Sequence, residues 1–177
     1  PEAIAKFPDN SEEIDILHRI QGRAEWHRFK WLLATRLGIL KYAAPDLAQP
    51  YVYFPLQDEI DVKISARNPF LDDQVMLSRL IARAIPPGYK LYVKEHPSHP
   101  GKWDWRGLRG LRRVSNIELV HPHTSSIELI KNAKAVVTVG STAGWEGFLL
   151  QVPVVSLGTS FYSLSDLIFN VGSLNEL

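Results

Sequence analysis

The sequence contains no cysteine among its 177 residues. This absence excludes disulfide bonds, metal sites built on thiolates and a cysteine nucleophile, and it fits a protein of a reducing compartment. Long apolar runs are also absent, since none approaches the roughly 20 residues that a helix needs to span a bilayer. We therefore expect a cytoplasmic protein.

The sequence also lacks an excess of either charge. Its 20 Lys and Arg residues balance 19 Asp and Glu residues, for a net charge of +1. No overall field favours nucleic acid, so we expect no nucleic-acid partner. The chain starts at Pro1 with neither a signal-peptide pattern nor an initiator Met, and we expect a piece of a longer protein.

The first 48 residues read as a leading helix or linker segment. Apolar residues at helical spacing predict a helix from Ser11 to about Tyr42, with Pro45 as the stop; they are Trp26, Phe29, Leu33, Leu37 and Leu40. The polar face carries Arg19, Arg23, Arg28, Lys30 and Arg36. This pattern favours a docking helix or interdomain linker, with a membrane-surface helix as the alternative.

From Gln49 the pattern changes to alternating strands and helices. The predicted strands are 51–54, 90–93, 117–120, 135–139 and 154–157, and the predicted helices are 72–85, 103–113, 125–132 and 142–151. Strands separated by helices of this length imply a parallel sheet with helices on both faces. We therefore expect residues 49–177 to form a Rossmann-like α/β domain.

Polar residues follow each predicted strand immediately. Ligands of such sheets bind beyond the carboxyl ends of the strands, so these segments are expected to line one crevice. They are residues 55–61, 94–97, 121–124, 140–142 and 158–162.

The segment after the fourth strand has the features of a phosphate-binding turn. Gly140, Ser141 and Thr142 are small residues at a helix start, where backbone N–H groups lack helical partners and carry the positive end of the helix dipole. Lys94 and His96 alternate in the chain and are expected to face this turn and neutralise a phosphate. Glu146, one helical turn further in, could accept hydrogen bonds from sugar hydroxyls.

Two other clusters favour simpler interpretations. His121 and His123 lack a third ligand at a suitable spacing, so we expect no metal and instead a loop edge that packs on a nucleobase. Arginines recur at near-helical spacing at positions 106, 109, 112 and 113. A solvated helix face is the default interpretation, and an acidic polymer or lipid headgroup is the alternative.

Several of these blocks together resemble the bacterial capsule polysaccharide biosynthesis proteins. The resemblance covers about residues 49–162, and its most specific parts are Lys94-Glu-His-Pro97 and Gly140-Ser-Thr-Ala-Gly-Trp-Glu146 in this order and spacing. It implies the C-terminal-type half of a GT-B glycosyltransferase, the half that holds the sugar nucleotide. Several members resemble transferases that use CMP-Kdo.

The resemblance also implies roles for individual residues. It assigns His96, Ser141 and Thr142 to the donor phosphate, with Gly140 in the same turn and Lys94 in support, and Glu146 to the ribose. In the loop after the first strand it implies Gln57 as a further donor contact. Glu59 or Asp61 would be the catalytic carboxylate, acting as a nucleophile or as a base toward the acceptor hydroxyl. The alternative is that these acids belong to a solvated turn.

We therefore expect the donor-binding domain of a glycosyltransferase that moves a sugar, with Kdo from CMP-Kdo as a candidate, onto a capsular or surface polysaccharide or its lipid-linked primer. The expected partners are a nucleotide sugar, a polysaccharide or glycolipid acceptor and an N-terminal acceptor domain, without which the fragment should be inactive. Peripheral association with the inner membrane is compatible with these partners. No separate cofactor is expected. The alternatives are a UDP-sugar 2-epimerase-like enzyme and a non-catalytic docking module for polysaccharide assembly.

Overall fold

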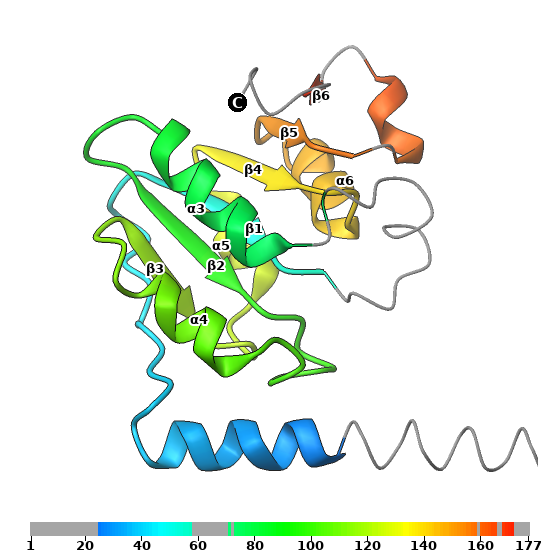
Figure 1. Cartoon of the computed structure of the whole chain (residues 1–177). Helices are drawn as coiled ribbons and strands as arrows, with labels where there is room; N and C mark the ends of the chain where they lie inside the picture. The colour runs from blue at the N-terminus through cyan, green and yellow to red at the C-terminus, as the bar shows by residue number, and fades with distance from the viewer. Residues whose placement is uncertain (1–24, 58–70, 72, 159, 166–167, 172–177) are drawn as a thin grey trace, which may run out of the picture.

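The computed structural model describes residues 25–57, 71, 73–158, 160–165 and 168–171. In these ranges the chain forms one parallel sheet of six strands, in the order β3-β2-β1-β4-β5-β6 (Figure 1). The strands are β1 (Tyr51–Pro55), β2 (Lys90–Lys94), β3 (Ile117–Val120), β4 (Ala135–Thr138), β5 (Val154–Ser156) and β6 (Ile168–Asn170). The α/β prediction is confirmed.

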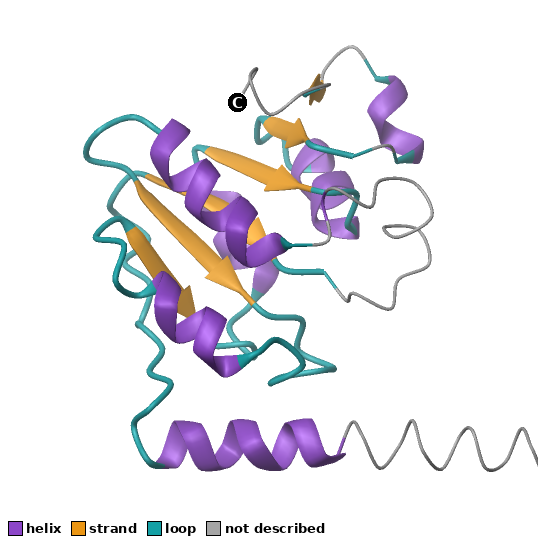
Figure 2. Cartoon of the chain, in the orientation of Figure 1, coloured by secondary structure: helices purple, strands orange, loops and turns teal. Residues whose placement is uncertain are grey.

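Helices connect the strands and cover both faces of the sheet (Figure 2). They are α3 (Gln74–Ala84), α4 (Trp105–Leu111), α5 (Ser126–Asn132) and α6 (Thr142–Leu149), and a 3-10 turn η2 (Phe161–Leu164) precedes β6. Successive residues of a strand point to opposite faces. In β1, Val52 and Phe54 join the core that holds α3 and α4, whereas Tyr51 and Tyr53 join the core that holds α5 and α6.

Short polar side chains cap the N-termini of three of these helices. The Asp73 carboxylate accepts a hydrogen bond from the backbone N–H of Met76 (2.8 Å) and Asp104 accepts one from Arg106 (3.3 Å). Ser125 Oγ accepts one from the N–H of Glu128 at 3.3 Å, as the Ser125-x-x-Glu128 pattern predicts. Such caps pair backbone donors that a helix start would otherwise leave without a partner.

The end of the leading helix differs from the prediction. The described part of this helix covers residues 25–36, and Gly38 at φ +66° ends it. The N–H groups of Gly38 and Ile39 return to the carbonyls of Thr35 (3.1 Å) and Ala34 (2.9 Å), which is the Schellman pattern of a helix end. The predicted continuation to Tyr42, with Pro45 as the stop, is therefore wrong.

The leading helix packs on the sheet domain through the face opposite to Trp26, Phe29, Leu33 and Leu37, so of the predicted apolar stripe only Leu40 is buried. Trp31 and Ala34 are buried in the same core as α3 and α4, and so is Leu40 just after the helix. Ala43 then forms a parallel bridge with Val120 of β3. In Figure 1 the helix lies below the sheet.

None of the helices in the described ranges combines the length and the apolar character that crossing a membrane requires.

Candidate functional site

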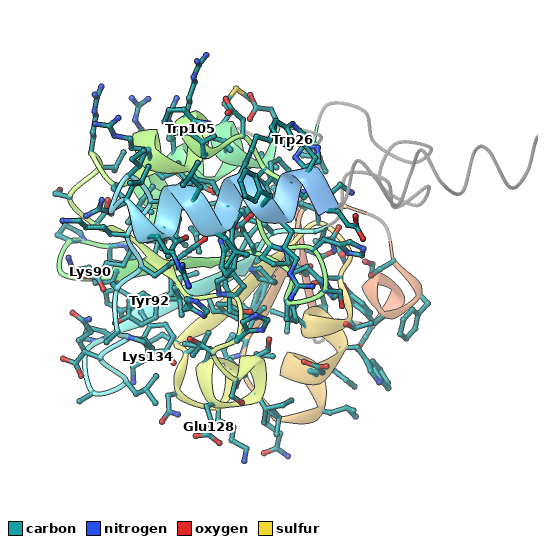
Figure 3. All side chains as sticks on the ribbon, turned by 90° about the horizontal axis from the view of Figure 1, so that it is seen from below. Trp26, Lys90, Tyr92, Trp105, Glu128 and Lys134 are labelled. Carbon is teal, nitrogen blue, oxygen red and sulfur yellow. The ribbon has the colours of Figure 1, made fainter. Side chains whose placement is uncertain are left out.

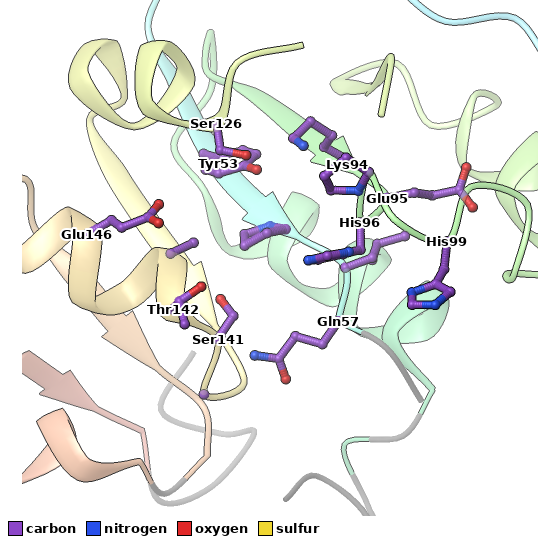
Figure 4. A pocket seen from close by; sticks show the side chains of 15 residues that line it. Tyr53, Gln57, Lys94, Glu95, His96, His99, Ser126, Ser141, Thr142 and Glu146 are labelled. Carbon is purple, nitrogen blue, oxygen red and sulfur yellow. The ribbon is translucent and has the colours of Figure 1, made fainter. Parts of the chain in front are cut away.

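A cavity of about 380 Å³ lies at the carboxyl ends of β1, β2 and β4 (Figure 4). The strand order reverses between β1 and β4, and this switch point is where open parallel sheets bind ligands. The structure brings seven predicted donor-binding residues together around this strand-end cavity: Gln57, Lys94, His96, Gly140, Ser141, Thr142 and Glu146.

The two sides of the strand-end cavity have different chemistry. Ser141, Thr142 and Glu146 come from the start of α6 on one side, and Lys94 and His96 come from the end of β2 on the other (Figure 4). Among the described residues, none of 121–124 after β3 and none of 158 and 160–162 after β5 lines this cavity, so the prediction that all five strand ends form one crevice is confirmed for three of them. In the strand order, β1 and β4 are neighbours at the switch point and β2 lies next to β1, whereas β3 is at the edge of the sheet.

The loops after β3 and β5 instead support residues of the strand-end cavity. The carbonyl of Pro122 accepts a hydrogen bond from Lys94 Nζ (3.0 Å). The hydroxyl of Tyr162 donates one to the carbonyl of Ser141 (2.6 Å).

The turn before α6 holds itself in shape through Thr138. The Oγ1 atom of Thr138 accepts hydrogen bonds from the N–H groups of Gly140 (3.1 Å) and Ser141 (2.9 Å), and it lies 2.9 Å from Ser141 Oγ. Two of the three backbone donors predicted for a phosphate are therefore already engaged. Ser141, the N-cap of α6, makes no side-chain bond to the helix, so an incoming anion can meet the helix start at Thr142 and beyond.

Gln57 connects the loop after β1 to this turn. Its side-chain amide faces the turn. When the amide oxygen rather than the nitrogen points toward the turn, that oxygen accepts hydrogen bonds from the N–H groups of Ser141 and Gly140, the latter at 3.3 Å. The buried Gln74 of α3 holds the Gln57 backbone by accepting from its N–H (2.7 Å) and donating to its carbonyl (3.4 Å). Sequence reasoning missed this positioning role of Gln74.

Lys94 and His96 provide positive charge or hydrogen-bond donors on the β2 side of the strand-end cavity. The Lys94 side chain is 3% exposed, and burial lowers its pKa while the nearby Glu146 carboxylate opposes that shift. Burial also lowers the pKa of His96, with further lowering from His99 and Lys94. His96 Nδ1 accepts from the N–H of Ser98 (3.2 Å), so the neutral ring carries its proton on Nε2 and can donate through that atom.

Glu95 points away from Lys94 and His96 and is 2% exposed. Its carboxylate accepts a hydrogen bond from the Tyr42 hydroxyl (2.8 Å) and another from the Gly101 N–H (3.0 Å). Burial raises the pKa of Glu95, and these hydrogen bonds oppose the shift. Trp31 Nε1 donates to Tyr42 Oη (2.6 Å), so the network joins the leading helix to the His96 loop.

His121 has aromatic neighbours within the protein. Its ring lies 5.1 Å from the Tyr42 ring and 5.9 Å from the Trp31 ring, centroid to centroid. His121 therefore packs on the leading segment in this structure, whereas His123 is exposed, and packing of this loop edge on a nucleobase stays a prediction. Among the described residues, no three histidine or carboxylate side chains are grouped to hold a metal ion.

The predicted catalytic carboxylates, Glu59 and Asp61, lie outside the described residues. Ser126 and Tyr53, by contrast, line the strand-end cavity but were not predicted. Burial raises the pKa of Tyr53 above its usual range, and a hydrogen bond with Ser126 partly opposes this. Tyr53 could have been found from strand alternation, because it shares its sheet face with the helices α5 and α6.

The sequence pattern of the capsule polysaccharide biosynthesis proteins matches residues 8–170 of this chain. The chain belongs to this family. Protein FixF of Sinorhizobium fredii is 30% identical over 153 residues, which cover 82% of this chain and 35% of FixF. The capsule polysaccharide export protein KpsS of Escherichia coli is 28% identical over 165 residues, which cover 87% of this chain and 41% of KpsS. This capsule-family chain thus spans well under half the length of these relatives.

Solved structures support the same fold assignment. The β-Kdo 2,7-transferase of KpsC from Thermosulfurimonas dismutans superimposes with a TM-score of 0.58 at 19% identity, over 85% of this chain and 47% of that one. The UDP-GlcNAc 2-epimerase of Methanocaldococcus jannaschii gives 0.56 at 16% identity, over 86% and 40%. At these identities the likeness concerns the fold. The capsule-family chain has the α/β fold of one half of a GT-B-type glycosyltransferase.

Proposed function

We propose that this chain is the donor-binding half of a glycosyltransferase that moves a sugar from a nucleotide onto a capsular or surface polysaccharide or its lipid-linked primer. The observation that carries the proposal is the strand-end cavity, where the uncapped start of α6 faces Lys94 and His96 across the switch point between β1 and β4. Membership of the capsule family supports the acceptor class.

In the proposed complex the donor phosphate lies between the start of α6 and the end of β2. Thr142 and the helix start donate hydrogen bonds, and the Ser141 hydroxyl adds another. The Lys94 ammonium group has little exposure to water, so its attraction for an anion is poorly screened. His96 donates from Nε2, and Glu146 accepts from a ribose hydroxyl.

These groups would act on the leaving group. When the bond between the anomeric carbon and the phosphate oxygen breaks, the nucleotide departs with the electron pair, and Lys94 and His96 stabilise the added charge. The acceptor oxygen forms the new bond to the anomeric carbon and gives its proton to a base, for which we propose Asp61 or Glu59. An alternative is that the carboxylate first attacks as a nucleophile.

The choice of nucleotide separates the proposal from its main alternative. A Kdo transferase would bind CMP, whereas a UDP-sugar 2-epimerase-like enzyme would bind UDP and need no acceptor; the structural likeness to an epimerase at 16% identity favours neither. We propose CMP-Kdo as the donor. We also propose that turnover requires an acceptor domain, so binding is the property to measure on this chain.

Calorimetric titration with CMP and with UDP tests the donor site. We expect CMP to bind, and we expect Ser141→Ala and His96→Ala to weaken binding by about tenfold each, since each removes a hydrogen bond to a charged group. His123→Ala is the matched control, because His123 is exposed and lies outside the strand-end cavity. Preference for UDP would favour the epimerase-like alternative. If neither nucleotide binds to the parent chain or to the variants, the donor-site proposal is wrong, and the non-catalytic docking module is the remaining alternative.

A further inference from the structure

The leading helix exposes a row of apolar side chains that the proposed donor site does not use. This apolar ridge consists of Trp26, Phe29, Leu32, Leu33 and Leu37, of which Trp26 is 57% exposed, Phe29 55% and Leu37 64%. The rings of Trp26 and Phe29 stack with their centroids 5.8 Å apart. A contiguous exposed apolar surface of this kind marks an interaction site more often than isolated exposed residues do.

The opposite face of the same helix is already occupied by the fold. Trp31 and Ala34 are buried, and Trp31 packs so closely on Gly101 that a Cβ there would lie 2.3 Å from Trp31 Cβ. The helix is therefore anchored to the domain by one side. In the view from below, the helix crosses the front of the molecule and Trp26 is on its near side (Figure 3). Because the face with Trp31 and Ala34 is buried against the domain, the apolar ridge on the opposite face points to solvent.

Basic residues surround the apolar ridge. Among the described residues 25–41, four are basic and one, Glu25, is acidic; the basic ones are Arg28, Lys30, Arg36 and Lys41. Lys30 Nζ lies 5.7 Å from the centroid of the Trp26 ring. The start of α4 lies across a hollow of about 310 Å³, which is lined by Lys30 on one side and by the exposed Asp104 and by Trp105 on the other (Figures 1 and 3).

We propose that the apolar ridge docks this protein on the surface of an anionic lipid bilayer. Tryptophan and phenylalanine favour the boundary between lipid headgroups and acyl chains, and a helix with such an apolar face and basic flanks lies in the plane of that boundary. Lysine and arginine at the flanks extend their charged ends to anionic headgroups. The excess of basic over acidic residues around the ridge is the complement of a negative surface.

Vesicle flotation of the 177-residue chain tests the proposal with two pairs of double variants. In the apolar pair, Trp26→Ser with Phe29→Ser alters the ridge, and Leu149→Ser with Phe169→Ser removes two similarly exposed apolar side chains elsewhere. In the charge pair, Arg28→Glu with Arg36→Glu alters the helix, and Lys131→Glu with Lys134→Glu makes the same change in net charge in and after α5, which covers the other face of the sheet. All these side chains are exposed, so the variants should fold.

We expect the parent chain to float with vesicles of phosphatidylglycerol and phosphatidylethanolamine and to bind phosphatidylcholine vesicles much more weakly. For Trp26→Ser with Phe29→Ser, the partition coefficient onto the anionic vesicles should fall at least about tenfold. For Arg28→Glu with Arg36→Glu, it should fall roughly fivefold per altered residue at low salt. Both controls should behave like the parent. Equal losses in ridge and control variants, or no preference for anionic lipid, would overturn the proposal.

A protein partner on the ridge would give a different result. If the parent chain ignores vesicles but sediments as a dimer, and Trp26→Ser with Phe29→Ser yields a monomer, the ridge is an interface between copies and the lipid proposal is wrong. Sedimentation analysis of the same four variants provides this measurement. Nucleotide binding should be unchanged in the ridge variant, because the ridge is no part of the strand-end cavity.

Discussion

The hydroxyl of Tyr42 donates a 2.8 Å hydrogen bond to the carboxylate of Glu95, although 53 residues separate them in the chain. Glu95 stands between Lys94 and His96, so this bond connects the segment after the leading helix to the loop that carries the proposed phosphate ligands. The second carboxylate oxygen accepts from Gly101 N–H, which holds the far end of the same loop. The sheet domain and the leading segment therefore share one buried polar network.

Tyr42→Phe should destabilise the fold by about 1–3 kcal/mol, because it leaves a buried carboxylate oxygen without its donor. Urea denaturation measures this change in the free energy of unfolding. Tyr89→Phe is a suitable control, since Tyr89 is only partly buried and lies outside the network. A Tyr42→Phe variant as stable as its control would show that the hydrogen bond contributes little.

Glu95 should also make stability depend on pH. Burial raises its pKa in the folded state, so the folded state holds this proton more tightly than the unfolded state does. The resulting stabilisation is complete below the ordinary carboxyl pKa of about 4.3 and is lost as pH rises through the raised value.

Glu95→Gln removes this titration while retaining an amide oxygen as acceptor. The free energy of unfolding of the variant should therefore increase relative to the parent as pH rises from about 4 to neutrality. Paired urea titrations across that range measure the difference. A constant difference between the two proteins would contradict the raised pKa.

Nucleotide affinity should increase as pH falls toward 5. The pKa of His96 is lowered in the free protein, and a bound phosphate would raise it by favouring the imidazolium. Affinity then increases as pH falls through the pKa of the bound form and levels off below that of the free form. Calorimetry of CMP binding between pH 5 and 8 measures the trend, and His96→Ala should flatten it. If the pH dependence of CMP affinity persists in His96→Ala, a group other than His96 causes it.

Gly144→Ala should destabilise the domain by about 1–3 kcal/mol through overpacking. A Cβ at this position would lie 2.6 Å from the Tyr162 hydroxyl oxygen and 2.9 Å from Thr138 Cγ2, so it would displace the group that donates to the Ser141 carbonyl. Nucleotide binding should weaken as well, because the same bond holds the turn before α6.

Gly107→Ala in α4 is the matched substitution. The nearest side-chain atom, Val75 Cγ2, would lie 3.4 Å from the new Cβ, which is ordinary contact. Alanine forms helix better than glycine by about 1 kcal/mol, so this variant should be as stable as the parent or more so. Urea denaturation of both glycine variants measures the contrast, and equal destabilisation would contradict the packing argument for Gly144.

The sequence alone was sufficient for the alternation of strands and helices and for the residues at the carboxyl end of each strand. Strands here are short apolar runs bounded by turn residues, and helix starts such as Ser125 carry their own local signal. Because parallel strands end at a common edge, the meeting of Lys94, His96 and the Gly140 turn could be predicted without coordinates. A glycine at position 38 is itself a signal for the end of the leading helix, but the apolar spacing continues past it to Leu40 and predicts a longer helix.

Tertiary structure decided the features that depend on which strands are neighbours and which side chains meet. The strand order β3-β2-β1-β4-β5-β6 places β1 beside β4 and β2 beside β1, the three strands whose ends line the strand-end cavity. The structure also adds β6, a three-residue strand too short for a clear periodic pattern. Thr138 was expected as a strand residue, yet its hydroxyl engages two of the amides predicted for a phosphate. The Tyr42–Glu95 bond and the outward apolar ridge likewise follow from long-range packing, because local sequence sets the faces of an element but not the partner that each face finds.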